Sequence, residues 1–108
     1  MDLLCRSAIV GSLPLLELVG ELDLASIPQF RDAILRLISD HVGSIVAIDL
    51  DGVTVLDDAG LGVLLGAAGR ARDHGGDVVL VCTDARLLGR FERSGLTRAI
   101  EVRPRLAP

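Results

Sequence analysis

Two short runs of apolar residues constrain the fold of this chain more than any other feature. Residues 45–50 and 78–82 are rich in branched side chains, which is typical of strands covered on both faces. Between them, residues 59–73 repeat apolar side chains at helical spacing, namely Leu61, Leu64, Leu65 and Ala68. A strand, a helix and a strand of these lengths predict a right-handed βαβ unit with parallel strands.

The rest of the chain adds elements on both sides of this unit. Residues 3–10 and 14–19 are apolar runs joined by turn-forming residues, which predicts an antiparallel pair of strands. Residues 26–41 predict a helix with one buried face, formed by Ile27, Phe30, Ile34, Leu37, Ile38 and His41. Residues 85–94 predict a last helix and residues 99–102 a short edge strand. The expected fold is α/β, a single mixed β-sheet with helices packed on it in the order β-β-α-β-α-β-α-β.

The length of 108 residues suits one small domain, which we expect over residues 1–102, with residues 103–108 as a C-terminal tail. No apolar run approaches the ~20 residues of a membrane span, so no direct membrane insertion is expected. The N-terminus lacks a basic segment before an apolar one, which argues against a signal peptide. We expect a cytoplasmic protein, either a monomer or a weak dimer.

Charge and composition argue against several classes of function. The formal net charge is −4, and the arginines are spread along the chain instead of forming a basic stripe. The aromatic residues are limited to Phe30 and Phe91, so bases have no stacking platform, and nucleic acid is a poor candidate partner. The serines show no nucleophile-elbow pattern, and no glycine-rich phosphate loop is present. We therefore expect neither an enzyme nor a cofactor.

The cysteines also give little sign of a chemical site. Cys5 and Cys82 are too few and too far apart for a zinc site, and each falls in or at the end of a predicted strand, where a buried free thiol is common. A redox role is the lesser alternative, and Cys82 is the better candidate because it lies at a strand end.

Residues 49–62 form the most informative motif for function. Here an apolar strand meets an acidic turn that opens a helix, and Asp57 or Asp58 can cap that helix. Together with Gly20-Glu21-Leu22-Asp23, the segment Asp57-Asp58-Ala59-Gly60-Leu61-Gly62 resembles the signature of STAS domains, most closely that of bacterial anti-anti-sigma factors. The resemblance extends over roughly the whole chain and implies the STAS fold.

The resemblance also implies a partner and a surface. Its partner would be an anti-sigma factor of the ATP-binding kinase class, and partner binding would fall on Glu21, Asp23, Asp57, Asp58, Ala59, Gly60, Leu61 and Gly62. In the family, the second serine of the signature accepts a phosphate from that kinase. Here Ala59 occupies this phosphoacceptor position and has no hydroxyl, so the usual switch is missing. Thr54 and Ser94 are less probable substitute acceptors because neither occupies the family position.

Simpler interpretations of the same residues remain open. Asp57 and Asp58 can be a helix cap and a solvated acid, and Asp23 can be a turn acid before a helix that starts at Ser26. The glycines of the 59–73 helix can allow close packing either on the sheet or on a partner.

Two functional alternatives also remain open. The first is a STAS accessory subunit of a lipid-transporting ABC complex. The second is a STAS domain that senses a small ligand.

Overall fold

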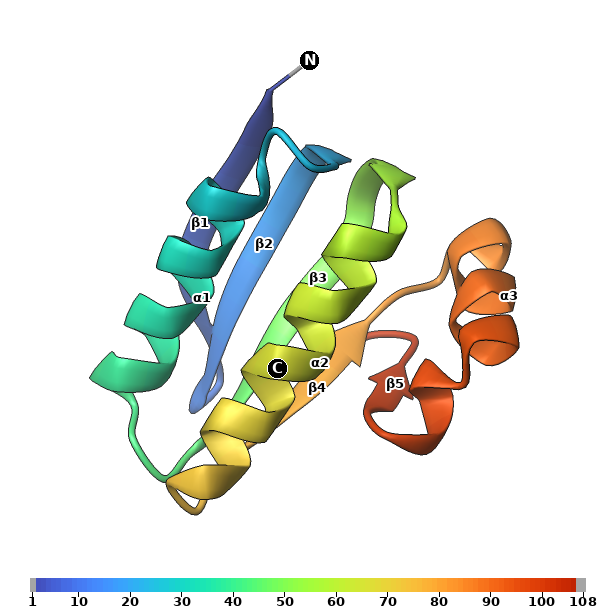
Figure 1. Ribbon diagram of the computed structural model, residues 1–108. Coiled ribbons are helices and arrows are strands. Elements are labelled where there is room, and N and C mark those ends of the chain that lie inside the picture. Colours follow the sequence, from blue (N-terminus) through green and yellow to red (C-terminus); the bar gives the residue numbers. More distant parts are fainter. Residues whose placement is uncertain (1, 107–108) are drawn as a thin grey trace.

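The computed structural model describes residues 2–106 as one five-stranded sheet covered by helices (Figure 1). The elements in chain order are β1 (Leu3–Val10), β2 (Leu13–Leu22), α1 (Ile27–Asp40), β3 (Ile45–Leu56), α2 (Asp58–Asp73), β4 (Asp77–Val81), α3 (Ala85–Ser94), a 3₁₀ turn (Leu96–Arg98) and β5 (Glu101–Arg103). The spatial order of the strands is β1-β2-β3-β4-β5. The predicted α/β class and the order of strands and helices are confirmed.

The sheet is mixed, as the sequence predicts. β1 pairs with β2 in antiparallel fashion, with Val10 opposite Leu13 at a tight turn where Gly11 has a positive φ of 64°. β2, β3, β4 and β5 pair in parallel, because a helix or a helical segment carries the chain back between successive strands. No helix among residues 2–106 is both long and apolar enough to cross a membrane.

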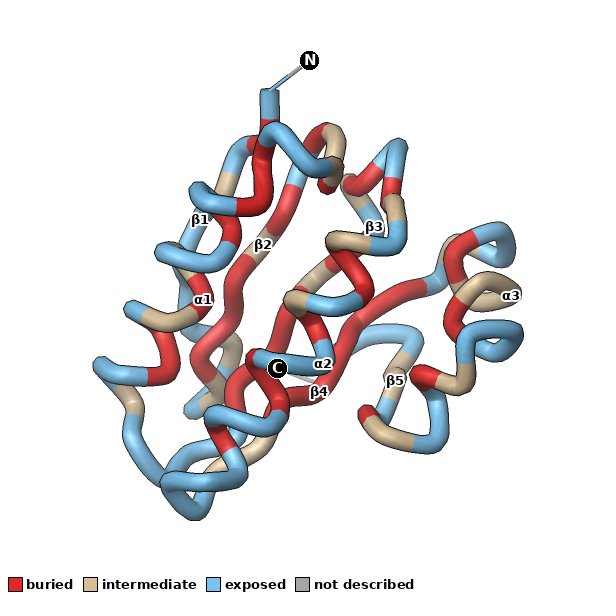
Figure 2. The backbone as a smooth tube through the Cα atoms, viewed as in Figure 1, coloured by how far each residue is buried: buried red, intermediate tan, exposed pale blue. Residues whose placement is uncertain are grey.

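The main core lies between the sheet and the helices α1 and α2, which cover the same face (Figures 1 and 2). Phe30 from α1, Leu64 from α2 and Ile48 from β3 are all fully buried there. A second apolar cluster on the sheet contains Leu15, Ala47, Val79 and Val81. The central strand therefore carries buried apolar side chains on both faces, which explains its nearly continuous apolar sequence.

Two residues of the expected C-terminal tail contact the sheet. Arg103 belongs to β5, and its carbonyl accepts a hydrogen bond from the N–H of Cys82 at 3.0 Å. Leu106 packs against the second cluster. The tail prediction for residues 107–108 lies outside the described residues.

The largest difference from the expected elements concerns β3. Residues 51–56, which lie beyond the predicted strand 45–50, continue the strand to Leu56, and β2 likewise extends to Leu22. β3 pairs with β4 only from Ile45 to Asp49, whereas its pairing with β2 continues to Leu56. The ends of β2 and β3 therefore project beyond β4, and the segments that follow these two strands meet there.

The prediction of which residues of α2 face the core is wrong at one position. Leu61, Leu64 and Ala68 are buried, but Leu65 is 43% exposed. The sequence did not separate the two neighbouring leucines because both fit a broad apolar stripe.

These neighbours provide a matched test of the core. Leu64→Ala should lower the free energy of unfolding by about 2–5 kcal/mol, because the Leu64 side chain is 0% exposed and its loss leaves a cavity. Leu65→Ala should change it by about 0.5 kcal/mol or less. Urea unfolding of both variants measures the difference, and equal losses would contradict this packing of α2.

Candidate functional site

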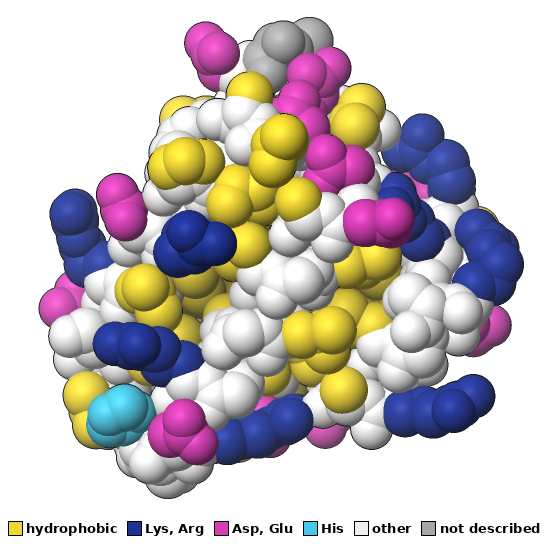
Figure 3. All heavy atoms as spheres, viewed as in Figure 1, with side chains coloured by type: hydrophobic (Ala, Val, Ile, Leu, Met, Phe, Trp, Pro, Cys, Tyr) yellow, Lys and Arg dark blue, Asp and Glu magenta, His cyan; other side chains and the backbone are white. Residues whose placement is uncertain are grey.

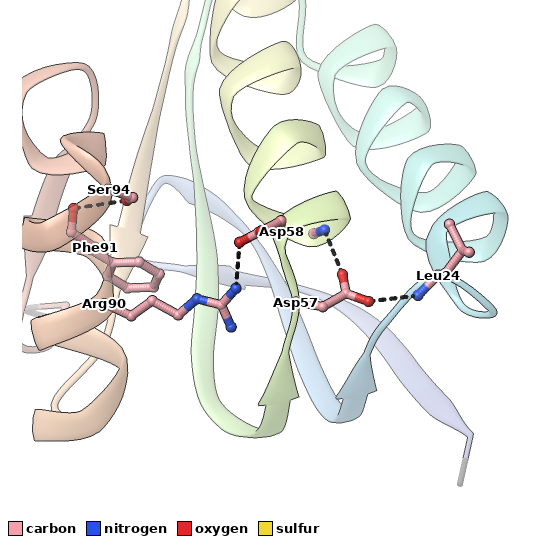
Figure 4. Close-up of polar contacts among 7 residues, drawn as sticks. Leu24, Asp57, Asp58, Arg90, Phe91 and Ser94 are labelled. Atoms are coloured by element: carbon pink, nitrogen blue, oxygen red, sulfur yellow. Dashed lines mark hydrogen bonds and ion pairs between the residues drawn. The ribbon is translucent and has the colours of Figure 1, made fainter.

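Asp57 joins the two segments that build the site. It is the N-cap of α2, and its Oδ1 accepts the N–H of Gly60 at 3.1 Å. Its Oδ2 accepts the N–H of Leu24 at 3.1 Å, in the loop between β2 and α1 (Figure 4). The N–H of Asp57 itself donates to the carbonyl of Leu22 at 3.2 Å. The capping prediction is confirmed for Asp57, which satisfies a helix-terminal amide and holds the loop beside it.

The same loop is held by a second set of hydrogen bonds. The N–H of Ser26 donates to Oδ1 of Asp23, and the N–H of Asp23 donates to Oγ of Ser26, both at 3.1 Å. The Ser26 hydroxyl also donates to the carbonyl of Glu21 at 2.8 Å. Ser26 does precede α1, but its side chain bonds backward to the loop. Asp23 therefore has a structural role, and partner contacts of Asp23 and the half-buried Glu21 stay predictions.

The signature residues after Asp57 divide into an outward and an inward group. The side chain of Asp58 is 97% exposed, and Gly62 is exposed as well. Ala59 is half-buried and lines a groove between α1 and α2. Gly60 and Leu61 are buried. Asp58, Gly62 and the half-buried Ala59 are therefore accessible to a partner in this structure, whereas Gly60 and Leu61 are not.

Gly60 has an internal packing role. A Cβ at this position would lie 2.8 Å from Cδ1 of Leu56 and 3.0 Å from Cγ of Leu22. These distances are too short for a side chain to fit without movement of both leucines. The glycine therefore lets the first turn of α2 start directly against the ends of β2 and β3.

An apolar groove of about 500 Å³ runs between α1 and α2. Its apolar walls include Leu24, Ile27, Leu35, Ala59, Val63 and Gly66. Arg31 and Arg70 add a positive charge from each helix. Figure 3 shows apolar side chains along this groove, basic side chains beside them, and acidic side chains gathered at the end where α2 begins. The groove and the start of α2 thus form one continuous surface.

The glycines of α2 leave this surface open. A Cβ added at Gly62, Gly66 or Gly69 would meet no atom of the described residues within 4 Å. The interpretation that these glycines allow close packing on the sheet is therefore wrong. The other interpretation, that they allow a partner to approach closely, stays a prediction. Each glycine costs about 1 kcal/mol of helix stability relative to alanine.

The cysteines lie in settings that suppress reactivity. Cys82 is 1% exposed and Cys5 is half-buried, and both are free thiols. Burial raises the pKa of the Cys82 thiol and of the Cys5 thiol, which reduces the reactive thiolate. The expectation of a buried thiol is confirmed for Cys82, and a redox role for either residue stays a prediction that this setting disfavours.

The hydroxyls of Thr54 and Ser94, the two candidates for a substitute phosphoacceptor, are both hydrogen-bonded to the backbone. The hydroxyl of Thr54 donates to the carbonyl of Gly20 at 3.2 Å. The hydroxyl of Ser94 donates to the carbonyl of Phe91 at 3.0 Å, near the end of α3 (Figure 4). Neither hydroxyl occupies the start of α2.

Sequence reasoning missed the most exposed apolar residue of the site. Leu24 is 74% exposed, and its backbone is held by Asp57 at the end of the groove. A signal was available, since a leucine stood between Asp23 and Ala25 in a segment read as a turn. Sequence reasoning also missed Arg31 and Arg70 as residues of the site. They line the same groove only because α1 and α2 pack side by side.

The model of the protein family described as STAS domain matches residues 7–107 of this chain. The chain belongs to the STAS domain family. An anti-sigma-B factor antagonist of Listeria monocytogenes is 34% identical over 84 residues, which cover 78% of this chain and 73% of that protein. The protein of the same name from Bacillus subtilis is 31% identical over 85 residues, covering 79% and 76% of the two chains.

The fold of this STAS domain is also similar to solved structures. A crystal structure of an anti-sigma factor antagonist from Mycobacterium paratuberculosis aligns with a TM-score of 0.80 and 22% identity, covering 97% of this chain and 88% of that one. At this identity the likeness shows the fold alone. The signature that the sequence suggested therefore lies in a STAS domain, at the exposed start of α2.

The double contact of Asp57 can be tested in this STAS domain. Asp57→Ala should lower the free energy of unfolding by about 0.5–2 kcal/mol, because the helix loses its cap. It should also speed hydrogen exchange at the amides of both Leu24 and Gly60, measured by NMR. Asp57→Asn keeps one acceptor oxygen and should protect only one of the two amides. Unchanged exchange at Leu24 in Asp57→Ala would contradict the bridge.

Proposed function

We propose that this STAS domain is an anti-sigma factor antagonist, which binds an anti-sigma factor of the ATP-binding kinase class and so releases a sigma factor. The observation that carries this proposal is the position of the family signature at the start of α2, where Asp58 and Gly62 are exposed and Ala59 lines an apolar groove. The names of the curated relatives support it. The protein acts in the cytoplasm through binding, without a catalytic step.

The partner contact is centred on Leu24 and the groove. An exposed leucine on a loop with a hydrogen-bonded backbone loses little conformational freedom on binding, which favours affinity. Arg31 and Arg70 flank the apolar walls, so the matching segment of the anti-sigma factor is apolar with acidic neighbours. The open glycine face of α2 lets the partner approach its backbone closely.

The proposed complex is insensitive to the usual serine phosphorylation. Phosphate on a side chain at position 59 would add nearly two negative charges beside the apolar groove, which would oppose partner binding. Ala59 lines that groove with a methyl group that cannot be phosphorylated. The anti-sigma factor therefore cannot phosphorylate this position, and so cannot end the complex by that route.

Capture from the host lysate followed by calorimetry tests the proposal. A tagged copy should recover an anti-sigma factor, and the purified pair should bind in the calorimeter. Leu24→Asp should weaken that binding by about 2 kcal/mol or more, because a carboxylate would replace a central apolar contact. Arg36→Gln lowers the net charge by one, as Leu24→Asp does, at an exposed position of α1 outside the groove, and is the matched control. Recovery of a transporter ATPase without an anti-sigma factor would favour the transport alternative instead.

Restoring the acceptor should restore the switch. In the presence of the anti-sigma factor and Mg-ATP, Ala59→Ser should gain one phosphate by mass spectrometry and lose more than about tenfold in affinity. Asp58→Ser moves the hydroxyl by one position and should remain unmodified, as should the natural sequence. Phosphorylation of the natural sequence at Thr54 or Ser94 would show that the chain is regulated by another acceptor.

A further inference from the structure

A cavity on the other side of Asp58 gathers three arginines. It has a volume of about 260 Å³ and lies between residues 54–56 of β3 and one face of α3. Arg86, Arg90 and Arg93 recur at four- and three-residue spacing, so they share that face. No acidic side chain within residues 2–106 lines this cavity. Figure 3 shows basic side chains gathered beside α3, in a chain whose net charge is −4.

The cavity exists because β4 ends early. β4 stops at Val81 and pairs with β3 only as far as Asp49, so the last residues of β3 have no strand neighbour on this side. The guanidinium of Arg86 takes the place of that neighbour and donates from Nη2 to the carbonyl of Thr54 at 2.9 Å. The basic face of α3 is therefore anchored at a defined distance from β3.

The arginines keep most of their hydrogen-bonding capacity. A guanidinium has five N–H donors, and Arg86 uses one of its Nη groups for Thr54. Arg90 donates to Oδ1 of Asp58 at 2.7 Å, across the cavity edge (Figure 4). Arg93 has no hydrogen-bond or ion-pair partner among the described residues. A Cβ at Gly89 would lie 3.0 Å from Nη1 of Arg93, so the glycine makes room for this guanidinium to fold back along α3.

We propose that this cavity binds the phosphate group of a small soluble molecule, and that Asp58 is an internal competitor for Arg90. A phosphate offers several acceptor oxygens and a charge near −2, which suits convergent guanidinium groups better than a single carboxylate does. Bound phosphate takes the Arg90 donors, and Asp58 gives up its ion pair. The carboxylate of Asp58 is 97% exposed, so water readily solvates it when it is released.

Titration of the isolated chain with inorganic pyrophosphate tests the site without any protein partner. At constant ionic strength, the side-chain Nε–Hε signals of Arg86, Arg90 and Arg93 should shift in NMR spectra and saturate. A parallel titration with ADP distinguishes the source of the phosphate: tighter binding than pyrophosphate indicates a nucleotide, and equal or weaker binding indicates a free phosphate compound. Shifts that rise linearly without saturating for both probes would mean non-specific screening and would overturn the proposal.

Variants assign the binding to these side chains. Arg93→Gln should weaken pyrophosphate binding by about tenfold or more, because one charge-assisted contact is lost and no internal bond is disturbed. Arg36→Gln, an exposed arginine on α1 outside this cavity, should bind as the natural sequence does. Equal weakening in both variants would show that only the overall charge matters and would contradict a site.

The competition has its own test. Asp58→Asn removes the charge that pairs with Arg90 and should tighten pyrophosphate binding several-fold. The signal of the Arg90 Nε–Hε group should already be shifted in this variant before any probe is added. Unchanged or weaker binding in Asp58→Asn would refute the role of Asp58 as a competitor.

Discussion

The carboxylate of Asp57 is the constraint on which the whole surface depends. Its two oxygens accept from Gly60 and Leu24, and the second of these contacts joins residues 33 positions apart in the chain. Hydrogen bonds to an ionised carboxylate are stronger than those between neutral groups. One side chain thereby fixes the start of α2 and the loop before α1 relative to each other. The exposed side chain of Leu24 lies at the end of the groove because its backbone is held there.

Much of the fold was predictable because the pattern is local. The apolar runs of β3 and β4 and the stripe of α1 are contained in short segments, and each indicated its element directly. The second half of β3 was not predictable in the same way. Asp51, Gly52 and Thr54 have the composition of a turn, but they extend the strand beside β2 alone. Polar residues are tolerated there because β4 no longer covers that edge.

The site was predictable where a motif marked it and not where packing created it. Asp57, Asp58 and Ala59 were identified by their place in the family signature, and the structure puts them at the start of α2. The groove was not predictable from the sequence, because its two walls come from α1 and α2 and its width depends on the separation of these helices. The ion pair between Arg90 and Asp58 joins residues 32 positions apart, and no local pattern in the sequence points to it.

The side chains of Asp58 and Ala59 point to different sides of the start of α2, which bears on the proposed insensitivity to phosphorylation. Asp58 extends toward α3, where its carboxylate meets Arg90 at 2.7 Å. Ala59, the next residue, lines the groove on the side of α1. A phosphate carried at position 59 would place its charge beside the groove, whereas the charge of Asp58 is on the other side of the helix start and is partly neutralised by an arginine. We therefore propose that Asp58 does not substitute for a phosphate at position 59. Its ion pair connects the start of α2 with the basic face of α3.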